Sequence, residues 1–276
     1  MRRHELSDAE WEFVRPLLPV SLRGRKRLDD RRVLNGIVWK FRTGTAWRDV
    51  PERYGPWATL HTRFRRWAAD GTFDRMLRAA QAKADAAGDV EWLVSVDSTV
   101  VRAHQHAAGA LRKGLRDPAL GRSRGGLTSK IHLACDGRGR PLGFVVTGGN
   151  INDCTRFTAV MEAIRVPRLG PGRPRIRPDR VLGDKGYSSK AIRTWLRRRG
   201  IPHTIPEGAD QARNRARRGS RGGRPPAFDR EVYKRRNVVE RCFNRLKQWR
   251  GIATRYDKTA QSYEAAVTLA SLLMWA

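Results

Sequence analysis

The stretch EWLVSVDSTVV, residues 91–101, decides the fold of this chain. Its apolar and β-branched composition is typical of a buried β-strand. In the residues before it, apolar side chains recur at helical spacing, so the hydrophobic period changes near Asp89. This change predicts two parts: a small all-α domain over residues 1–88 and an α/β domain over residues 89–276.

Three helices are expected in the first part. Ser7 and Glu10 have the spacing of a capping box, which opens a short helix, and residues 30–43 and 57–69 carry apolar residues at helical spacing. The third helix also carries the arginines Arg63, Arg65 and Arg66. A helix, a turn and an Arg-bearing helix suit a helix-turn-helix unit that enters a DNA groove. Three helices packed together without any DNA contact are the alternative.

In the second part, segments with the pattern of strands alternate with segments typical of helices. The elements are expected in this order: two strands within 129–149, a helix over 151–164, a strand at 179–184, a helix over 188–200 and a strand at 201–206. This alternation predicts an α/β layer architecture with helices over a central sheet. The Arg/Gly-rich segments near 108–126 and 207–224 are predicted to be flexible basic loops.

The charge balance indicates a polyanionic partner. The chain has 57 Lys and Arg residues against 27 Asp and Glu residues, a formal charge of +30. Such an excess destabilises the compact state by self-repulsion unless a polyanion screens it, so nucleic acid is the first candidate. No membrane partner is expected, because the apolar residues 263–276 are too few to span a bilayer and predict a packed helix instead. Three widely spaced cysteines without a CxxC motif fit a reducing cytoplasm.

Acidic residues are scarce, so their positions carry information. Asp97 follows the apolar run LVSV, and Asp184 follows VLG. Both are expected at strand ends, and the carboxyl ends of strands in an open α/β sheet are where ligands gather. Taken singly, each is better explained as a cap or turn residue.

A third acid, Glu240, stands alone among the bases of YKRRNVVERCFNRLKQWR, residues 233–250. At about 100° per residue, Glu240 shares one helix face with Tyr233, Arg236, Asn244 and Lys247, beside an apolar stripe. An ordinary i,i±4 ladder with Arg236 and Asn244 is one explanation. The other is a metal ion that bridges the acid and a phosphate. Three carboxylates could hold two hard divalent cations, while the bases position the DNA backbone.

These motifs resemble the DDE transposases of bacterial insertion sequences, in the group named for insertion sequences four and five. That group's signature Y-x2-R-x3-E-x6-K is matched by Tyr233, Arg236, Glu240 and Lys247. The motifs VDST at Asp97 and GDKGY at Asp184 match its two other acidic motifs. Residues 43–67 and 125–154 also look like segments of this group, so the resemblance covers nearly the whole chain.

The resemblance implies an RNase H-like core in which Asp97, Asp184 and Glu240 are the catalytic metal ligands. The implied cofactor is Mg²⁺, as two ions that Mn²⁺ is able to replace. Contacts to the phosphates of the transposon end are implied for Tyr233, Arg236 and Lys247. Asn244 on the same helix face and Lys185 beside Asp184 are further candidates for DNA contact, although Gly186 explains the KGY motif equally well as a tight turn.

The implied function is that of a DNA transposase. It would bind the terminal inverted repeats of an insertion sequence, cleave the ends and transfer the 3'-hydroxyl to target DNA. A homodimer or higher synaptic assembly, located in the bacterial cytoplasm at the nucleoid, follows from the same resemblance. Two alternatives stay open: a metal-dependent nuclease without strand transfer, and a catalytically silent DNA-binding regulator. The hairpin chemistry of relatives with a long β insertion before the Glu is not assumed.

Overall fold

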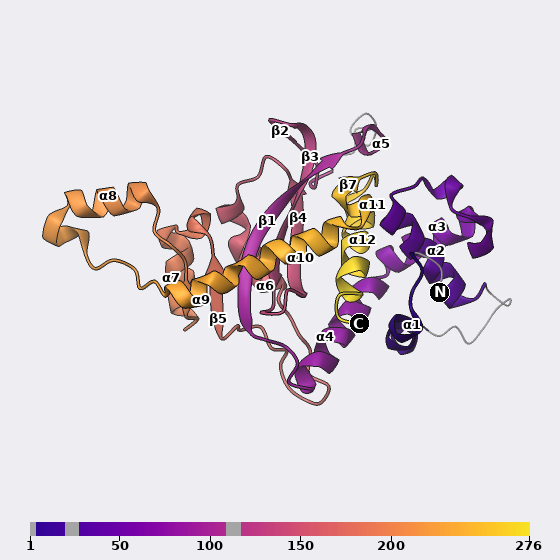
Figure 1. Ribbon diagram of the computed structural model, residues 1–276, viewed down its shortest axis with the longest axis horizontal. Helices are drawn as coiled ribbons and strands as arrows, with labels where there is room; N and C mark the ends of the chain where they lie inside the picture. Colours follow the sequence, from indigo (N-terminus) through magenta and orange to yellow (C-terminus); the bar gives the residue numbers. More distant parts are fainter. Residues whose placement is uncertain (1–3, 20–27, 109–116) are drawn as a thin grey trace.

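A mixed seven-stranded sheet lies at the centre of the computed structural model, which describes residues 4–19, 28–108 and 117–276, as Figure 1 shows. The strands are β1 (Leu93–Ala103), β2 (Gly121–Ser123), β3 (Gly126–Cys135), β4 (Pro141–Gly148), β5 (Arg180–Gly183), β6 (His203–Thr204) and β7 (Thr254–Arg255). β1 pairs antiparallel with β3 and parallel with β5 and β7. β3 also pairs antiparallel with β2 and β4, and β6 lies parallel beside β5. The mixed sheet confirms the predicted α/β class.

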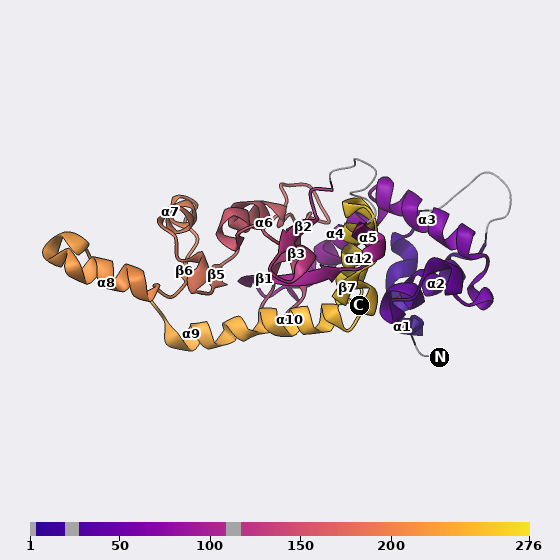
Figure 2. The same ribbon diagram turned by 90° about the horizontal axis from the view of Figure 1, so that it is seen from above.

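Helices cover both faces of this sheet, as Figure 2 shows. The helices after β1 are α5 (Gln105–Ala108), α6 (Phe157–Ala163), α7 (Lys190–Arg198), α8 (Ala209–Arg217), α9 (Arg230–Lys234), α10 (Val238–Lys247), α11 (Arg250–Ala253) and α12 (Ala260–Leu272). α10 runs along β1 on one face, while α6 packs on β3 and β4 on the other. Val239, Cys242 and Leu246 of α10 are buried, because the amphipathic helix turns this stripe to the sheet.

The N-terminal region is helical, as predicted. Its helices are α1 (Asp8–Val14), α2 (Asp30–Thr43), α3 (Trp57–Ala69) and α4 (Thr72–Ala86). Ser7 and Glu10 form the predicted capping box at the start of α1, and α2 and α3 have the predicted bounds. Two short 3-10 turns, Trp47–Asp49 and Glu52–Tyr54, lie between α2 and α3.

One hydrophobic core joins these helices to the sheet. The C-terminal helix α12 packs on α3 and α4, and α11 packs on α2. The predicted division near residue 88 falls between α4 and β1, and it stays a prediction because the core is continuous across it. α12 is the packed terminal helix expected from the sequence. None of the helices in the described residues combines the length and the apolar character needed to cross a membrane.

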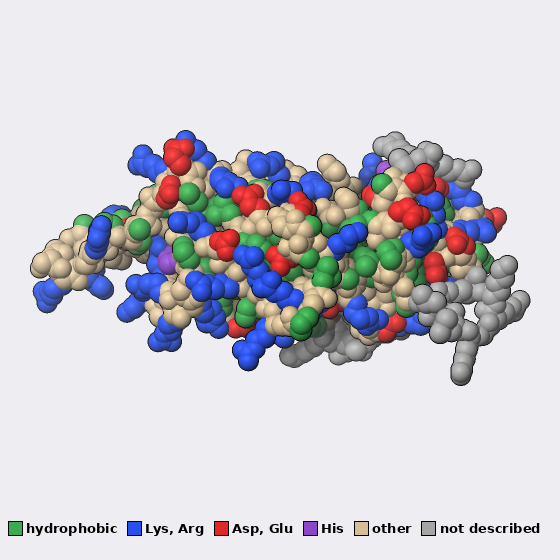
Figure 3. All heavy atoms as spheres, turned by 90° about the horizontal axis from the view of Figure 1, so that it is seen from below, with side chains coloured by type: hydrophobic (Ala, Val, Ile, Leu, Met, Phe, Trp, Pro, Cys, Tyr) green, Lys and Arg blue, Asp and Glu red, His purple; other side chains and the backbone are tan. Residues whose placement is uncertain are grey.

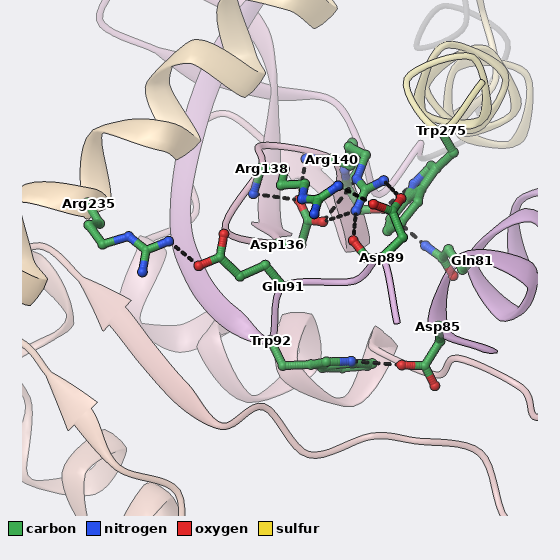
Figure 4. Close-up of polar contacts among 11 residues, drawn as sticks. Gln81, Asp85, Asp89, Glu91, Trp92, Asp136, Arg138, Arg140, Arg235 and Trp275 are labelled. Atoms are coloured by element: carbon green, nitrogen blue, oxygen red, sulfur yellow. Dashed lines mark hydrogen bonds and ion pairs between the residues drawn. The ribbon is translucent and has the colours of Figure 1, made fainter. Parts of the chain in front are cut away.

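A buried polar network ties the helical region to the sheet, as Figure 4 shows. Asp136, in the turn between β3 and β4, is fully buried and accepts hydrogen bonds from Nε and Nη2 of Arg140 at 3.0 and 2.7 Å. Arg140 also binds Asp89 and lies 4.2 Å from the ring centroid of Trp275. Gln81 of α4 and Trp275 each donate to carbonyl oxygens at the start of β4. Helix α4, the β3–β4 turn and the C-terminal Trp275 are thereby held together.

Part of each predicted basic loop has regular secondary structure. Within 207–224, residues Ala209–Arg217 form α8, which projects away from the sheet in Figures 1 and 2. The Glu207 side chain accepts from Arg215, with a shortest distance of 2.7 Å, so an ion pair holds this helix that composition alone did not reveal. Of 108–126, residues 109–116 lie outside the described residues. Residues Gly121–Ser123 form strand β2, because backbone pairing with β3 needs no apolar side chains.

The segment 233–250 also differs from the single helix that was predicted. A 3-10 turn, Arg235–Asn237, separates α9 from α10, and α11 begins at Arg250. A 3-10 helix has about three residues per turn, so residues before this turn are rotated relative to a continuous α-helix. Arg236 lies within the turn, and its side chain still reaches Glu240, at the i,i+4 spacing that the helical projection predicts.

Candidate active site

Asp97 is the first acid of the site, and it lies in the middle of β1 rather than at its end. The strand continues because residues after Asp97 keep their pairing with β3 as far as Arg102. The side chain of Asp97 is 24% exposed, and the N–H of Ser98 donates to its Oδ1 at 2.8 Å. Burial raises the pKa of Asp97, and the negative charge of Asp184 adds to that rise.

Asp184 follows β5 directly, as predicted. β5 runs parallel to β1, and the last residue pair between them is Val96 with Gly183. Asp97 and Asp184 are the next residue of each strand, so the two acids leave neighbouring strands, about 4.8 Å apart, at the same level. The N–H of Gly186 donates to Asp184 Oδ1 at 2.8 Å, which fixes the orientation of this carboxylate.

Glu240 approaches from the covering helix α10, with its side chain 53% exposed. It is joined to Asp97 by Arg236. Arg236 Nη2 donates to Glu240 Oε1 at 2.7 Å, and Nη1 of the same guanidinium donates to Asp97 Oδ2 at 2.9 Å. The i,i+4 pair of Arg236 and Glu240 is therefore present, together with a long-range contact to β1 that the helical projection did not predict.

The chemistry of this donor set suits a hard divalent cation, since all of its ligands are carboxylate oxygens. The positions of the side chains, however, do not form a complete set of metal ligands. Within residues 4–19, 28–108 and 117–276, no three His, Cys, Asp or Glu side chains are gathered closely enough to hold a metal ion. The guanidinium of Arg236 stands between Asp97 and Glu240. Asp97 and Asp184 lie on neighbouring strands at the same level, and Glu240 is linked to Asp97 through Arg236.

Of the other predicted residues of the segment 233–250, Tyr233 lies in α9, and Asn244 and Lys247 lie in α10. Lys247 Nζ donates to the carbonyl oxygen of Val100 in β1 at 3.3 Å, and burial lowers the pKa of Lys247. Tyr233 is half-buried and packs against the ring of Phe228 at 5.0 Å between centroids. Asn244 is exposed.

The cations predicted outside this segment divide into two kinds. Lys185, in the turn after Asp184, is exposed, and so are Arg65 and Arg66 of α3. Arg63 is only 7% exposed, because its Nη1 is 2.6 Å from Asp30 Oδ1 on the neighbouring helix α2. A DNA contact through Arg63 would require breaking this ion pair.

A second polar cluster, on the opposite face of β1, supports the site and was not foreseen. Asp153 accepts from Ser98 Oγ at 2.7 Å and pairs with Lys130 Nζ at 3.0 Å. Asn152, not Asp153, caps the turn that follows, by accepting from the N–H of Cys154. Successive residues of a strand face opposite sides, so Ser98 and Asp97 connect this cluster to the face of β1 that carries Asp97. The sequence signal was Lys130, a cation within a strand whose other residues are uncharged, because a largely buried cation requires a polar or acidic partner.

Lys and Arg side chains are spread widely over the surface around these elements. On the face drawn in Figure 3, they gather especially over the half of the molecule that ends in α8, at left, with acidic side chains scattered among them. An extended surface rich in cations fits a long polyanion better than a small acidic ligand.

Comparisons with known proteins bear on both parts of the chain. A family model described as a transposase DDE domain matches residues 88–275, and one described as a putative transposase of the IS4/5 family matches residues 6–77. No solved structure matches the chain.

Three relatives are each similar to part of this chain. An uncharacterized protein y4sN of Sinorhizobium fredii is 43% identical over 116 residues, which cover 41% of this chain and 89% of that protein. A putative transposase for insertion sequence element IS402 of Burkholderia cepacia is 34% identical over 146 residues, covering 53% of this chain and 62% of that protein. A putative transposase for insertion sequence element IS6501 of Brucella ovis is 27% identical over 149 residues, covering 54% and 98%.

Proposed function

This chain belongs to the DDE-domain transposases of the IS4/5 type, and on that premise we propose that it cleaves DNA at the terminal inverted repeats of an insertion sequence and transfers the freed 3'-hydroxyl to target DNA. Membership in the family brings an RNase H-like fold, action on DNA and a dependence on divalent metal ions. The ions we propose are two Mg²⁺, which Mn²⁺ is able to replace.

One observation carries this proposal. Asp97 and Asp184 leave adjacent parallel strands at the same level, and Arg236 connects Asp97 to Glu240 on the covering helix. Three acids that are far apart in the sequence of a chain with a charge of +30 thus lie on β1, directly after β5 and on the helix α10 that packs on β1. Burial of a carboxylate such as Asp97 costs free energy, which a charged partner offsets. Partly buried acids of this kind are typical of catalytic sites and of sites for structural cations.

The residues of the site have different proposed roles in the cleavage and transfer of phosphodiester bonds. Asp97, Asp184 and Glu240 would hold the divalent cations, which supply Lewis-acid stabilisation and a more acidic attacking hydroxyl when bound. The N–H groups of Ser98 and Gly186 orient the two strand carboxylates in advance.

Cationic and polar side chains would position the DNA around these acids. Tyr233 of α9 and Asn244 and Lys247 of α10 lie on either side of Glu240 in the chain, and their proposed role is to bind phosphates of the transposon end. Arg65, Arg66 and Lys185 are exposed and extend the proposed contacts to α3 and to the turn after β5. We assign the assembled state to a homodimer or higher complex on DNA ends, in the bacterial cytoplasm at the nucleoid.

Asp184→Asn tests the proposal. This substitution removes one charge while keeping the shape of the side chain, so Mg²⁺-dependent cleavage of a duplex that contains the element's end should fall at least a hundredfold while binding is retained. Asp179→Asn is the matched control, because Asp179 precedes the same strand at its other end and its side chain is 74% exposed. Cleavage by Asp184→Asn at the rate of the control would contradict the assignment.

The products of the same assay separate the rival functions. A transposase joins the labelled end to a second DNA molecule, whereas a metal-dependent nuclease leaves cut ends alone. A silent DNA-binding regulator gives binding without either product. We expect both cleaved and joined DNA from the unmodified chain.

A further inference from the structure

Arg236 makes a contact that its proposed DNA-binding role does not explain. Its guanidinium donates to Asp97 Oδ2 and to Glu240 Oε1 at once, at 2.9 and 2.7 Å, and its side chain is only 18% exposed. Both acceptors are acids assigned above to the metal ions. A side chain that binds DNA in this conformation would have to reach solvent, yet Arg236 points inward between a strand and a helix.

The oxygens that Arg236 occupies are those that a divalent cation needs. Carboxylates offer a guanidinium and a hard cation the same lone pairs, and a forked guanidinium satisfies two of them with charge-assisted hydrogen bonds. Asp97 and Glu240 are linked by the guanidinium of Arg236.

We propose that Arg236 and a divalent cation compete for the carboxylate oxygens of Asp97 and Glu240, and that the two exchange with each other. In the conformation described here, the Arg236 guanidinium donates to both carboxylates and so holds Glu240 near Asp97. When the cation binds, the guanidinium leaves these oxygens, and the released fork becomes available for a DNA phosphate. This inference rests on the proposed function, since it uses the same carboxylates as metal ligands. It assigns Arg236 as a positioning residue with two alternating partners.

The exchange has a consequence that a simple role in metal-site assembly does not have. If Arg236 only helped to organise the acids, its removal would weaken metal binding. If Arg236 competes with the cation, its removal strengthens metal binding. We expect roughly a tenfold gain in affinity, because two charge-assisted hydrogen bonds no longer have to be broken before the cation enters.

Arg235 provides a matched control one residue away. It lies in the same 3-10 turn and carries the same charge, but its guanidinium faces Glu91, next to the start of β1, as Figure 4 shows. Removing either arginine therefore changes the net charge of the chain equally. Only Arg236 touches the proposed metal ligands.

The experiment measures Mn²⁺ binding to the full chain without DNA, by electron paramagnetic resonance of the free ion. Arg236→Gln should bind Mn²⁺ about tenfold more tightly than the unmodified chain, and Arg235→Gln should bind it with unchanged affinity. Arg236→Lys should lie between, because an ammonium lacks the fork that spans both carboxylates. It also serves as the second variant if Arg236→Gln does not fold.

Asp184→Asn separates the two ways in which the inference can fail. If Asp184→Asn loses Mn²⁺ while neither Arg236 variant binds it more tightly, the exchange is wrong and the metal site stands. If Asp184→Asn binds Mn²⁺ as well as the unmodified chain does, the metal site and the exchange are both overturned.

Discussion

His132 carries the clearest pH dependence among single residues. It lies on β3 beside the Asp153 cluster, is 1% exposed, and its Nε2 is 2.9 Å from Thr147 Oγ1. Burial lowers the pKa of His132 to about 4. A histidine in the unfolded chain has a pKa near 6.5, so the unfolded state binds the proton more readily.

The free energy of unfolding should therefore fall as the pH drops from about 6.5 toward about 4, by as much as roughly 3 kcal/mol from this residue. Above that window the contribution of His132 is fully present. His132→Leu removes the titrating group, so its stability should vary less across the window than that of the unmodified chain, as measured by urea unfolding. Parallel pH profiles for the two proteins would contradict the assignment.

At the residue scale, the sequence indicated which side chains belong to the candidate site, but not all of their partners. Asp97, Asp184 and Glu240 stood out because acids are rare in a basic chain, and the structure brings Asp97 beside Asp184 and links it to Glu240. The contact between Arg236 and Asp97 could not be predicted, because it depends on a 3-10 turn and on two residues far apart in the chain. The burial of Arg63 was missed for the same reason, since a helical projection gives a face and not a partner.

At the scale of elements, the contact between α11 and α2 can be tested at a single residue. Gly44 ends α2 with a φ of +73°, a left-handed conformation that favours glycine. A Cβ atom at Gly44 would lie 2.9 Å from Cβ of Arg250 and 3.3 Å from its backbone carbon. Glycine is required here both for the turn and for the close approach of the two helices.

Gly44→Ala should consequently destabilise the protein by about 2–3 kcal/mol, from the backbone strain and the steric overlap together. Gly88→Ala is the matched control: Gly88 follows the end of α4 with a φ of +69°, but a Cβ there meets nothing within 4 Å. That variant should lose only about 1 kcal/mol. Equal losses in thermal or urea unfolding would show that the α2–α11 contact is not as close as described.

Elements with a strong hydrophobic period were predicted well, and those held by ion pairs or by backbone pairing were not. α2 and α3 have their expected bounds because apolar residues recur at helical spacing and core packing uses that face. α8 was predicted as a loop because it contains no buried residue to mark a period. β2 escaped notice because three edge residues show no alternation and are defined by their pairing with β3.

At the scale of the whole molecule, the charge of +30 dominates the interaction with DNA. Each phosphate that a lysine neutralises releases counterions, so binding should weaken steeply as salt is raised. Lys247 lies at the end of α10 against β1, on the proposed DNA path. Lys247→Gln should weaken binding to an end-containing duplex and reduce the slope of log affinity against log salt by about 0.9.

Lys83→Gln is the control for this prediction, because Lys83 is exposed near the end of α4 and the substitution changes the net charge equally. Its slope should match that of the unmodified chain. If both variants reduced the slope by the same amount, net charge alone would account for the effect and Lys247 would have no specific phosphate contact.

The fold class of the molecule could be predicted from the sequence, but the packing of its elements against one another could not. The order of helices and strands gave the α/β layers, since each element has its own local pattern. The continuous core between the N-terminal helices and the C-terminal helices α11 and α12 depends on contacts between opposite ends of the chain, which no local pattern records. The polar network around Asp136 and Arg140 belongs to the same class of long-range contacts.

Glu240→Gln tests whether Asp97, Asp184 and Glu240 form one catalytic site, because Glu240 is linked to Asp97 through Arg236. The measurement is divalent-metal-dependent cleavage and joining of a duplex that contains the element's end, with binding followed in parallel. We expect Glu240→Gln to bind the duplex with normal affinity while cleavage and joining fall at least a hundredfold. Cleavage and joining at the unmodified rate would show that Glu240 is only the partner of Arg236 in a helical ion pair, and that the three acids do not form one catalytic site.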